Sequence, residues 1–491
     1  MRSSRRIGLA LFVVVALTAA ACGGGDGDDG GGNGRAASSG CPVKALDSAK
    51  GPVRISVWHS LTALPKRTLE ALADQYNKSQ SKVVVSVENQ GTTPTELHRK
   101  IDQAIPDRSL PALVMPDDTK TRFVADSGYF VPASDCFDAD PEAKATLDDL
   151  LPIAKASYTL DGKLWPASFL TYTALVFYNR SHFQAAGLDP DKPPATISEM
   201  IDMARTIKQR TPQVSHPLVI KAQSFIFEWW LSGAGQALVN DDNGRGKDLP
   251  TESEFDNPTT RQILEELKAA KAEGILDVVP GTEGQVDHLL AMATQQSSMV
   301  VESSAATSTV AGVIEGTIKA EDLKEELGVD LPAGLKLDLD IGVGPYPGVK
   351  EPGRGQVGGN VVYISNTVPD EQQAAAWDFM KFLNSKPSQI RWGVEGSVSP
   401  VLKSVGSDPQ MQKAWSSSLA GRWGKVAYDV LANIPTDFPG PVIGPYDEVR
   451  RAIERCLDRV LLNDEPIDAA VKEADANMTK ALRSYNADVG G

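Results

Sequence analysis

The densest group of aromatic side chains in the sequence lies in the segment SFIFEWWLSG, residues 224–233. This segment contains Phe225, Phe227, Trp229 and Trp230, in a chain of which only 6% is aromatic. Aromatic rings stack on the apolar C–H faces of sugars and polyols, while polar groups nearby fix the hydroxyls. Trp229 and Trp230 are therefore candidates for contact with a hydroxyl-rich ligand. The alternative is that alternating members of the group pack in a protein core.

Residues that commonly carry catalysis or bind metals form no coherent set. The 5 histidines never stand at metal-ligand spacing and no CxxC motif occurs, so we expect no metal site and no cofactor. Ser232 lacks the glycine two residues before it that a nucleophile elbow requires, and no Gly-rich phosphate loop is present. With 64 acidic residues, some carboxylate pair at glycosidase spacing can always be found, so that signal has almost no specificity.

Residues 1–21 have the layout of a bacterial export signal. Arginines within residues 2–6 precede the apolar run IGLALFVVVAL and then small residues. The run is shorter than the about 20 helical residues that cross a bilayer. The alanines directly before Cys22 resemble a lipobox, in which that cysteine is lipidated and becomes the new N-terminus. Cleavage nearby as an ordinary secretory signal is the alternative.

The segment that follows is typical of a flexible tether. Residues 23–40 read GGGDGDDGGGNGRAASSG and contain no apolar side chain larger than Ala, so they cannot offset the entropy of ordering. We expect residues 22–50 to form a lipid anchor and linker that hold the protein on the outer face of the cytoplasmic membrane. The formal charge of -15 argues against a nucleic-acid partner.

Export also places the chain in an oxidising compartment, where disulfides form. If Cys22 carries lipid, three cysteines remain and at most one intrachain disulfide is possible. Cys456 lies in RRAIERCLDRVLL, on one helical face with other apolar residues, which favours a buried free thiol. Cys41 and Cys136 are therefore the expected pair.

Strands and helices alternate along the rest of the chain, which indicates an α/β fold. The first three strands and the two helices between them predict a βαβαβ unit with a parallel sheet. The expected strands cover residues 53–58, 83–87, 112–114, 174–179, 298–303, 340–346 and 360–365. The expected later helices lie near residues 196–209, 258–273, 369–384 and 446–462.

A resemblance to a known family rests on a series of short motifs. YNRSHF at 178–183, AGLDP at 186–190 and PP at 193–194 are similar, nearly residue for residue, to a signature of bacterial extracellular solute-binding proteins of family 1. These are the ABC-importer receptors for sugars and glycerol phosphates. Further motifs match in order, namely VWHS at 57–60, FDNP at 255–258, GPYPG at 344–348, AWDFMKFL at 376–383 and GSVSPV at 396–401.

The resemblance implies a periplasmic-binding-protein-like fold, with two α/β lobes, a hinge and a ligand cleft between the lobes. The expected first lobe comprises residues 51–165 and 360–405, and the second comprises 166–359 and 406–491. A ligand that touches both lobes stabilises the closed form through contacts that the open form lacks.

The resemblance also implies ligand-binding residues. Asp118 matches an acidic residue after the third strand, whose carboxylate accepts sugar hydroxyls. Arg450 matches a late arginine that can fork onto phosphate oxygens near a helix start; pairing with Asp447 or Glu454 is the alternative role. The remaining candidates from the matched motifs are Ser60, Tyr172, Ser304, Gly359, Asn360, Ser397 and Tyr446.

Two departures from the pattern widen the range of possible ligands. Thr93 stands where glycerol-phosphate receptors have a tyrosine, and Ser397 or Val398 replaces a second one. A sugar, a short oligosaccharide or a glycerophosphodiester all fit. We therefore expect a monomeric receptor, with no enzyme activity, that delivers such a solute to ABC permease subunits. The alternative function is a membrane-anchored, carbohydrate-active hydrolase.

Overall fold

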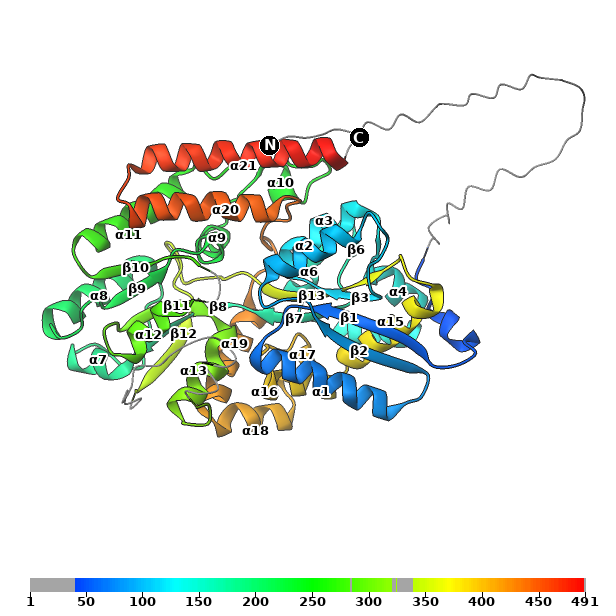
Figure 1. Cartoon of the computed structure of the whole chain (residues 1–491). Helices are drawn as coiled ribbons and strands as arrows, with labels where there is room; N and C mark the ends of the chain where they lie inside the picture. The colour runs from blue at the N-terminus through cyan, green and yellow to red at the C-terminus, as the bar shows by residue number, and fades with distance from the viewer. Residues whose placement is uncertain (1–39, 283–284, 320–323, 325–338, 490–491) are drawn as a thin grey trace, which may run out of the picture. The chain divides into compact units, whose positions relative to one another are not determined.

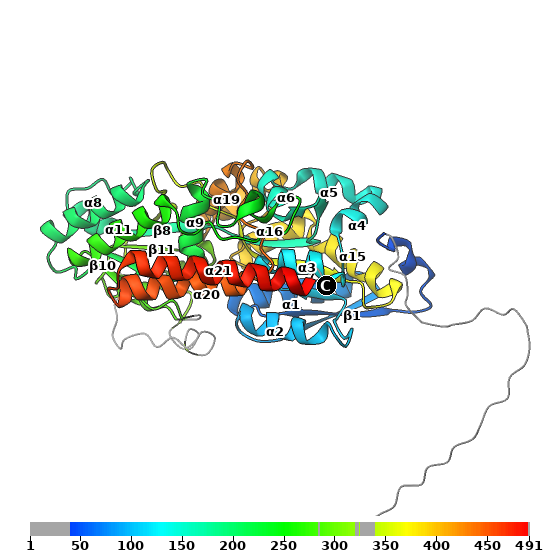
Figure 2. The ribbon, with the colours of Figure 1, turned by 90° about the horizontal axis from the view of Figure 1, so that it is seen from above.

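The computed structural model describes residues 40–282, 285–319, 324 and 339–489. The expected export signal, the lipidated Cys22 and most of the expected linker lie outside the described residues. The described chain contains two main β-sheets, each with helices packed on it, and these form two lobes (Figures 1 and 2). The expected α/β class is confirmed.

The first lobe is built on the sheet β2–β1–β3–β13–β4, with β7 also paired to β13. Its strands are β1 (Val53–His59), β2 (Val83–Asn89), β3 (Leu113–Met115), β4 (Phe130–Val131), β7 (Ser168–Tyr172) and β13 (Gly358–Ser365). Strands β2, β1 and β3 are parallel, as the expected βαβαβ unit requires. The late strand β13 runs antiparallel to β3, so a distant part of the chain completes this sheet.

The second lobe is built on the sheet β10–β9–β11–β8–β12. Its strands are β8 (Ala174–Asn179), β9 (Leu218–Lys221), β10 (Leu276–Val279), β11 (Met299–Ser303) and β12 (Ile341–Pro345). Strand β8 is antiparallel to both of its neighbours, while β9 is parallel to β10 and β11. Only Thr173 separates β7 of the first sheet from β8 of the second, so the chain passes between the lobes there.

The helices have the lengths and caps that their sequences favour. At the start of α2 the side chain of Thr93 accepts from the backbone N–H of Glu96, and the Glu96 carboxylate accepts from the backbone N–H of Thr93, which together form a capping box. The helices between β1 and β7 in the chain are α1 (Ala63–Ser79), α2 (Pro94–Ala104), α3 (Thr121–Ser127), α4 (Ala133–Ala139), α5 (Lys144–Asp149) and α6 (Pro152–Tyr158). Those of the middle of the chain are α7 (Arg180–Ala185), α8 (Ile197–Arg210), α9 (Ser224–Gly233), α10 (Asn240–Gly244), α11 (Pro258–Ala272), α12 (Asp287–Ala293) and α13 (Thr307–Ile314).

The C-terminal part adds helices to both lobes. They are α15 (Asp370–Leu383), α16 (Lys386–Glu395), α17 (Lys403–Gly406), α18 (Pro409–Ser417), α19 (Leu419–Asn433), α20 (Tyr446–Leu457) and α21 (Ile467–Val489). The short 3-10 helices are η1 (Val43–Ser48), η2 (Asp118–Lys120), η3 (Pro141–Ala143) and η4 (Ser304–Ala306), and η5 (Asp458–Leu462) is a π-helix. The two-residue strands β5 (Thr159–Leu160) and β6 (Lys163–Leu164) pair with each other. Helices α20 and α21 pack side by side over the second lobe (Figures 1 and 2).

Most expected elements are confirmed within one or two residues. The helix expected near 446–462 is α-helical only as far as Leu457, and the chain continues from there as the π-helix η5. Strands β7, β9 and β10 and the two-residue strands β4, β5 and β6 were not expected. Strand β9 is wholly buried and only 4 residues long, so it shows no alternation of polar and apolar residues.

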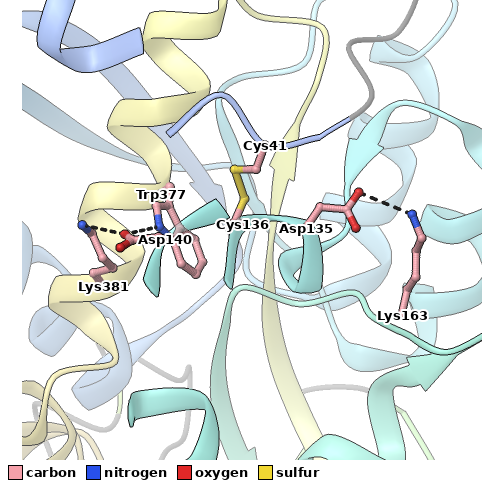
Figure 3. The surroundings of a disulfide bond; sticks show 7 residues. All are labelled: Cys41, Asp135, Cys136, Asp140, Lys163, Trp377 and Lys381. Atoms are coloured by element: carbon pink, nitrogen blue, oxygen red, sulfur yellow. Dashed lines mark hydrogen bonds and ion pairs between the residues drawn. A yellow bond between two sulfur atoms is a disulfide. The ribbon is translucent and has the colours of Figure 1, made fainter. Parts of the chain in front are cut away.

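A disulfide joins Cys41 to Cys136, the pair expected from the cysteine count, and Cys456 is a buried free thiol. Figure 3 shows that this bond attaches the start of the described chain to α4. Asp140 just beyond α4 accepts from Trp377 Nε1 at 3.0 Å and forms an ion pair with Lys381 at 3.0 Å, both on α15 (Figure 3). The expected linker of residues 22–50 is therefore wrong over its described part, because Cys41 is bonded to α4 and residues 43–48 form the 3-10 helix η1.

Candidate functional site

A cavity with an empty volume of about 410 Å³ is lined by residues from both lobes. The first lobe contributes the turn after β3, the end of α6 and the start of β13, and the second contributes α9, α20 and the loop between α19 and α20. The lining residues are Asp118, Thr119, Thr121, Ser157, Tyr158, Trp229, Arg245, Gln356, Val357, Gly358, Pro439, Pro441, Val442, Tyr446 and Arg450.

Asp118 forms the acidic corner of the cavity. It is the first residue of the 3-10 helix η2, three residues after Met115, the last residue of the buried strand β3. Its Oδ2 accepts from the hydroxyl of Tyr158 at 3.0 Å, and the backbone N–H of Gly359 also donates to the carboxyl group. Burial and the neighbouring charge of Asp117 raise the pKa of Asp118 well above its ordinary value, although Arg450 and these two donors oppose the shift. The carboxyl can therefore serve as a donor or an acceptor for a ligand hydroxyl.

The two glycines at the start of β13 allow the chain to approach its neighbours closely. Gly359 has φ +141, and a Cβ atom there would lie 2.0 Å from the carbonyl oxygen of Leu170. A Cβ on Gly358 would lie 3.0 Å from the Trp229 ring. A side chain at either position would push β13 away from Leu170 or Trp229, and would thereby displace the N–H of Gly359 that donates to Asp118.

The basic corner comes from α20 and α9. Tyr446 and Arg450 stand four residues apart on α20 and therefore share a face. The Arg450 guanidinium lies 5.0 Å from the centre of the Tyr446 ring. Both residues donate to the carboxylate of Glu228 on α9, Tyr446 Oη to Oε2 at 3.1 Å and Arg450 Nε to Oε1 at 3.2 Å.

Arg450 links this corner to the first lobe. Its Nη1 lies 3.6 Å from Oδ1 of Asp117, which directly precedes η2. Burial alone would lower the pKa of Arg450, but the negative charges of Glu228 and Asp117 raise it well above its ordinary value. The ion pairs of Arg450 are thus with Glu228 and Asp117, and not with the sequence neighbours considered as alternatives.

Glu228 was not expected from the sequence. Its side chain is only 1% exposed, and it is the one charged residue in the apolar segment SFIFEWWLSG. A carboxylate amid residues of this kind must find a partner if the segment is buried. That contrast between one acid and its apolar neighbours was the signal available in the sequence.

Arg245, at the end of α10, was also not expected. Its guanidinium donates five hydrogen bonds to backbone carbonyls, as many as it has N–H groups. The strongest are from Nε to Gly440 at 2.7 Å and from Nη2 to Ser157 at 2.8 Å. Burial lowers the pKa of Arg245 to about 10, so the group is still charged at neutral pH. Arg245 thereby joins α6 of the first lobe to α10 and the loop before α20.

The two tryptophans of the aromatic segment have different surroundings. Trp229 lines the cavity and packs against Phe225, with ring centres 5.3 Å apart. Trp230 lies in the core of the second lobe, stacked on Tyr346, and its Nε1 donates to the carbonyl of Pro347 at 2.9 Å. Trp229 is also buried in this core, at 4% exposure, so both tryptophans pack in the second lobe and contact between Trp229 and a ligand stays a prediction.

The other residues singled out in the sequence do not line this cavity. Asn360 pairs with Asp117 as an isolated bridge, and Ser304 Oγ accepts from the backbone of Thr173 at the crossing between the lobes. Ser397, with φ +56, donates to the carbonyl of Ala305 at 3.1 Å. Ser60 is buried at the end of β1, and Tyr172 packs on the core of the first lobe. The structure therefore brings together Asp118, Trp229, Tyr446 and Arg450, with Gly359 directly behind them.

No group of three or more His, Cys, Asp or Glu among the described residues is arranged to hold a metal ion. The cavity has paired carboxyl and guanidinium groups, hydroxyls and one indole, which suit hydrogen bonding and ring stacking.

Comparison with known proteins places this geometry in context. Residues 71–417 match the family model described as bacterial extracellular solute-binding protein. The sn-glycerol-3-phosphate-binding periplasmic protein UgpB of Rhizobium meliloti is 29% identical over 164 residues, which are 33% of this chain and 37% of that protein. In such matches this chain covers little more than a third of the length of the curated relative. UgpB of Pectobacterium atrosepticum matches over 91% of this chain and 96% of its own length, at 22% identity.

Solved structures show the same fold. The cyclic α-maltosyl-1,6-maltose binding protein of Arthrobacter globiformis superposes with a TM-score of 0.68 at 20% identity, over 88% of this chain and 100% of that one. UgpB of Mycobacterium tuberculosis in complex with glycerophosphocholine gives 0.67 at 18% identity, over 89% and 99%. These neighbours confirm the two-lobed fold, and the family match covers more than half of the sequence. The chain belongs to the bacterial extracellular solute-binding protein family.

Proposed function

We propose that this protein is the solute receptor of an ABC importer. It captures a sugar, an oligosaccharide or a glycerol-phosphate-type solute between its two lobes and delivers it to the membrane permease. The observation that carries this proposal is the cavity in which Asp118 of the first lobe faces Trp229 and Arg450 of the second. The names of the relatives, which bind glycerol phosphate, glycerophosphocholine or maltose-type sugars, support the solute class.

The proposed ligand contacts divide between the lobes. Asp118 and Tyr158 would bind hydroxyls from one side, while Trp229 and Tyr446 offer an aromatic wall on the other. Because these groups belong to different lobes, a ligand that touches both favours the closed arrangement by its differential contacts. In this proposal the lobes follow the expected division into residues 51–165 with 360–405, and 166–359 with 406–491, except that β7 and the whole of β13 belong to the first lobe because they pair in its sheet. The hinge lies at the segments that cross between the lobes, one of them at Thr173.

We further propose that Cys22 is lipidated and that residues 23–39 tether the receptor to the outer face of the membrane. The support for this is the order of charged, apolar and small residues before Cys22 and the Gly/Asp-rich composition after it. No helix within the described ranges is long and apolar enough to cross a bilayer.

Calorimetry with a panel of solutes tests the proposed function. The panel comprises glycerol, ribitol, maltose, maltotriose, sn-glycerol 3-phosphate and glycerophosphocholine, with amino acids and a peptide as controls. We expect saturable binding of at least one hydroxyl-rich compound and recovery of that compound unchanged. Binding of amino acids or peptides alone contradicts the solute class, and turnover of a bound compound contradicts the receptor function.

A further inference from the structure

The guanidinium groups at the cavity already have anionic or carbonyl partners from the protein. Arg450 donates through Nε and Nη2 to Glu228, and its Nη1 faces Asp117. Arg245 has all five of its hydrogen bonds with backbone carbonyls. A phosphate group entering the cavity finds no guanidinium fork that is free of such partners.

Glu228 is held too firmly to yield Arg450 to a phosphate. Its Oε2 accepts from Tyr446 and from Arg450, and its Oε1 accepts from Arg450, so both oxygens are engaged. The side chain is 1% exposed, and therefore water cannot replace the lost partner. A phosphate that took the arginine would leave the buried Glu228 carboxylate with the Tyr446 hydroxyl but without the Arg450 cation, beside the negative charge of the phosphate, which is strongly unfavourable.

Asp117 adds to this effect from the first lobe. Its Oδ1 lies 3.6 Å from Nη1 of Arg450, while Glu228 accepts from Nε and Nη2, so two acidic groups share one cation. The other hydrogen-bonding side chains that line the cavity include the Asp118 carboxyl, the Tyr158 hydroxyl that donates to it, and the amide of Gln356. Groups of this kind match the hydroxyls of an uncharged solute.

We propose that Glu228 is a specificity-determining residue, which selects uncharged, hydroxyl-rich ligands and disfavours those with a terminal phosphate. This inference rests on the proposed receptor function and narrows its ligand class. It assigns to Arg450 the role of a structural cation that holds Glu228, Tyr446 and Asp117 in place, in contrast to the phosphate-binding role that the sequence resemblance implies.

The test compares affinities by calorimetry on the full-length protein, with maltose, maltotriose and ribitol as neutral probes and sn-glycerol 3-phosphate as the phosphorylated probe. In the wild-type protein we expect the phosphate ester to bind at least about 100-fold more weakly than the best neutral probe. In Glu228→Gln, which leaves Arg450 with a neutral partner, the affinity for the phosphate ester rises at least about tenfold.

The matched control is Glu454→Gln. Glu454 is a nearby acid on α20 whose Oε1 accepts from Ser224, and its removal changes the charge equally without touching the Arg450 fork. Glu454→Gln should leave the affinity for the phosphate ester unchanged. An equal gain in both variants shows a general charge effect and overturns the role of Glu228.

A measurement on the wild-type protein keeps the inference testable if Glu228→Gln does not fold. A large excess of inorganic phosphate should not displace the best neutral probe, and displacement overturns the inference. Tighter binding of sn-glycerol 3-phosphate than of every neutral probe overturns the inference but leaves the receptor function intact. If no probe in the panel binds, the proposed function fails, and the inference fails with it.

Discussion

Removal of the Cys41–Cys136 disulfide should destabilise the first lobe by an amount that follows from the topology. The bond closes a loop with a sequence separation of 95 residues, which contains β1 to β4 and helices α1 to α3. In the chain-entropy model a loop of this length restricts the unfolded chain by about 4.7 kcal/mol at 25 °C, and measured losses usually lie at about 2–5 kcal/mol.

The double variant Cys41→Ala/Cys136→Ala should nevertheless fold. Asp140 still anchors the end of α4 to α15 through Trp377 and Lys381, and Asp135 still pairs with Lys163 (Figure 3). The native contacts of α4 therefore persist, and the loss falls mainly on the unfolded state. This separates the effect of the cross-link from a loss of packing.

Urea unfolding followed by tryptophan fluorescence measures the effect, with and without dithiothreitol. We expect reductant to destabilise the wild-type protein and to leave the double variant unchanged. Cys456→Ala is the control; because it removes one buried sulfur atom and no cross-link, it should cost only about 1 kcal/mol and retain the response to reductant. If the double variant loses less than about 1 kcal/mol, or still responds to reductant, the reasoning is refuted.

Four further changes have expected outcomes. Asp118→Ala should weaken ligand binding by about 1.5–3 kcal/mol in calorimetry with little change in the urea midpoint, because a buried hydrogen-bonding group is lost; an unchanged affinity contradicts its role. Arg245→Met should lower the free energy of unfolding by about 3 kcal/mol, because carbonyls of both lobes lose their donor, and an unchanged urea midpoint contradicts this. Burial alone would raise the pKa of Asp447, but the hydrogen bond and charge of His98 and the charges of Lys120 and Arg450 lower it below the ordinary 3.8. The ionised Asp447 therefore stabilises the fold above about pH 4, and this stabilisation is lost as the pH falls through the lowered pKa. Acid titration of Asp447→Asn should therefore show a shallower loss of stability than the wild-type protein below about pH 4, and equal slopes refute the assignment. Finally, Cys22→Ala should release the protein from membranes in detergent partitioning, and unaltered partitioning shows that the anchor lies elsewhere.

The sequence predicts the elements best where burial produces a clear pattern. Strand β1 alternates buried and partly exposed residues, and α20 carries a continuous apolar face, so both could be located from period alone. Strand β7 (SFLTY) is almost wholly buried and contains serine and threonine, so neither alternation nor an apolar run marks it. Its pairing with β13, nearly 200 residues later in the chain, is a long-range contact that no local pattern records.

The residues of the candidate site likewise divide into those that a sequence pattern indicates and those that only the structure brings together. Asp118 and Arg450 could be found because motif positions carried them, and both line the cavity. Glu228 could not be paired with Arg450 from the sequence, since 222 positions separate the two. Arg245 was missed for a different reason: its partners are backbone carbonyls, which every residue has.

The measurement that tests the account most directly is a crystal structure of the protein with the tightest ligand from the calorimetric panel. We expect ligand density between Asp118 and Trp229, with ligand hydroxyls in hydrogen-bond contact with Asp118 and with the Glu228–Arg450 pair intact. Density in any other part of the molecule, or contacts confined to a single lobe, would contradict the claim that the solute is held between the lobes.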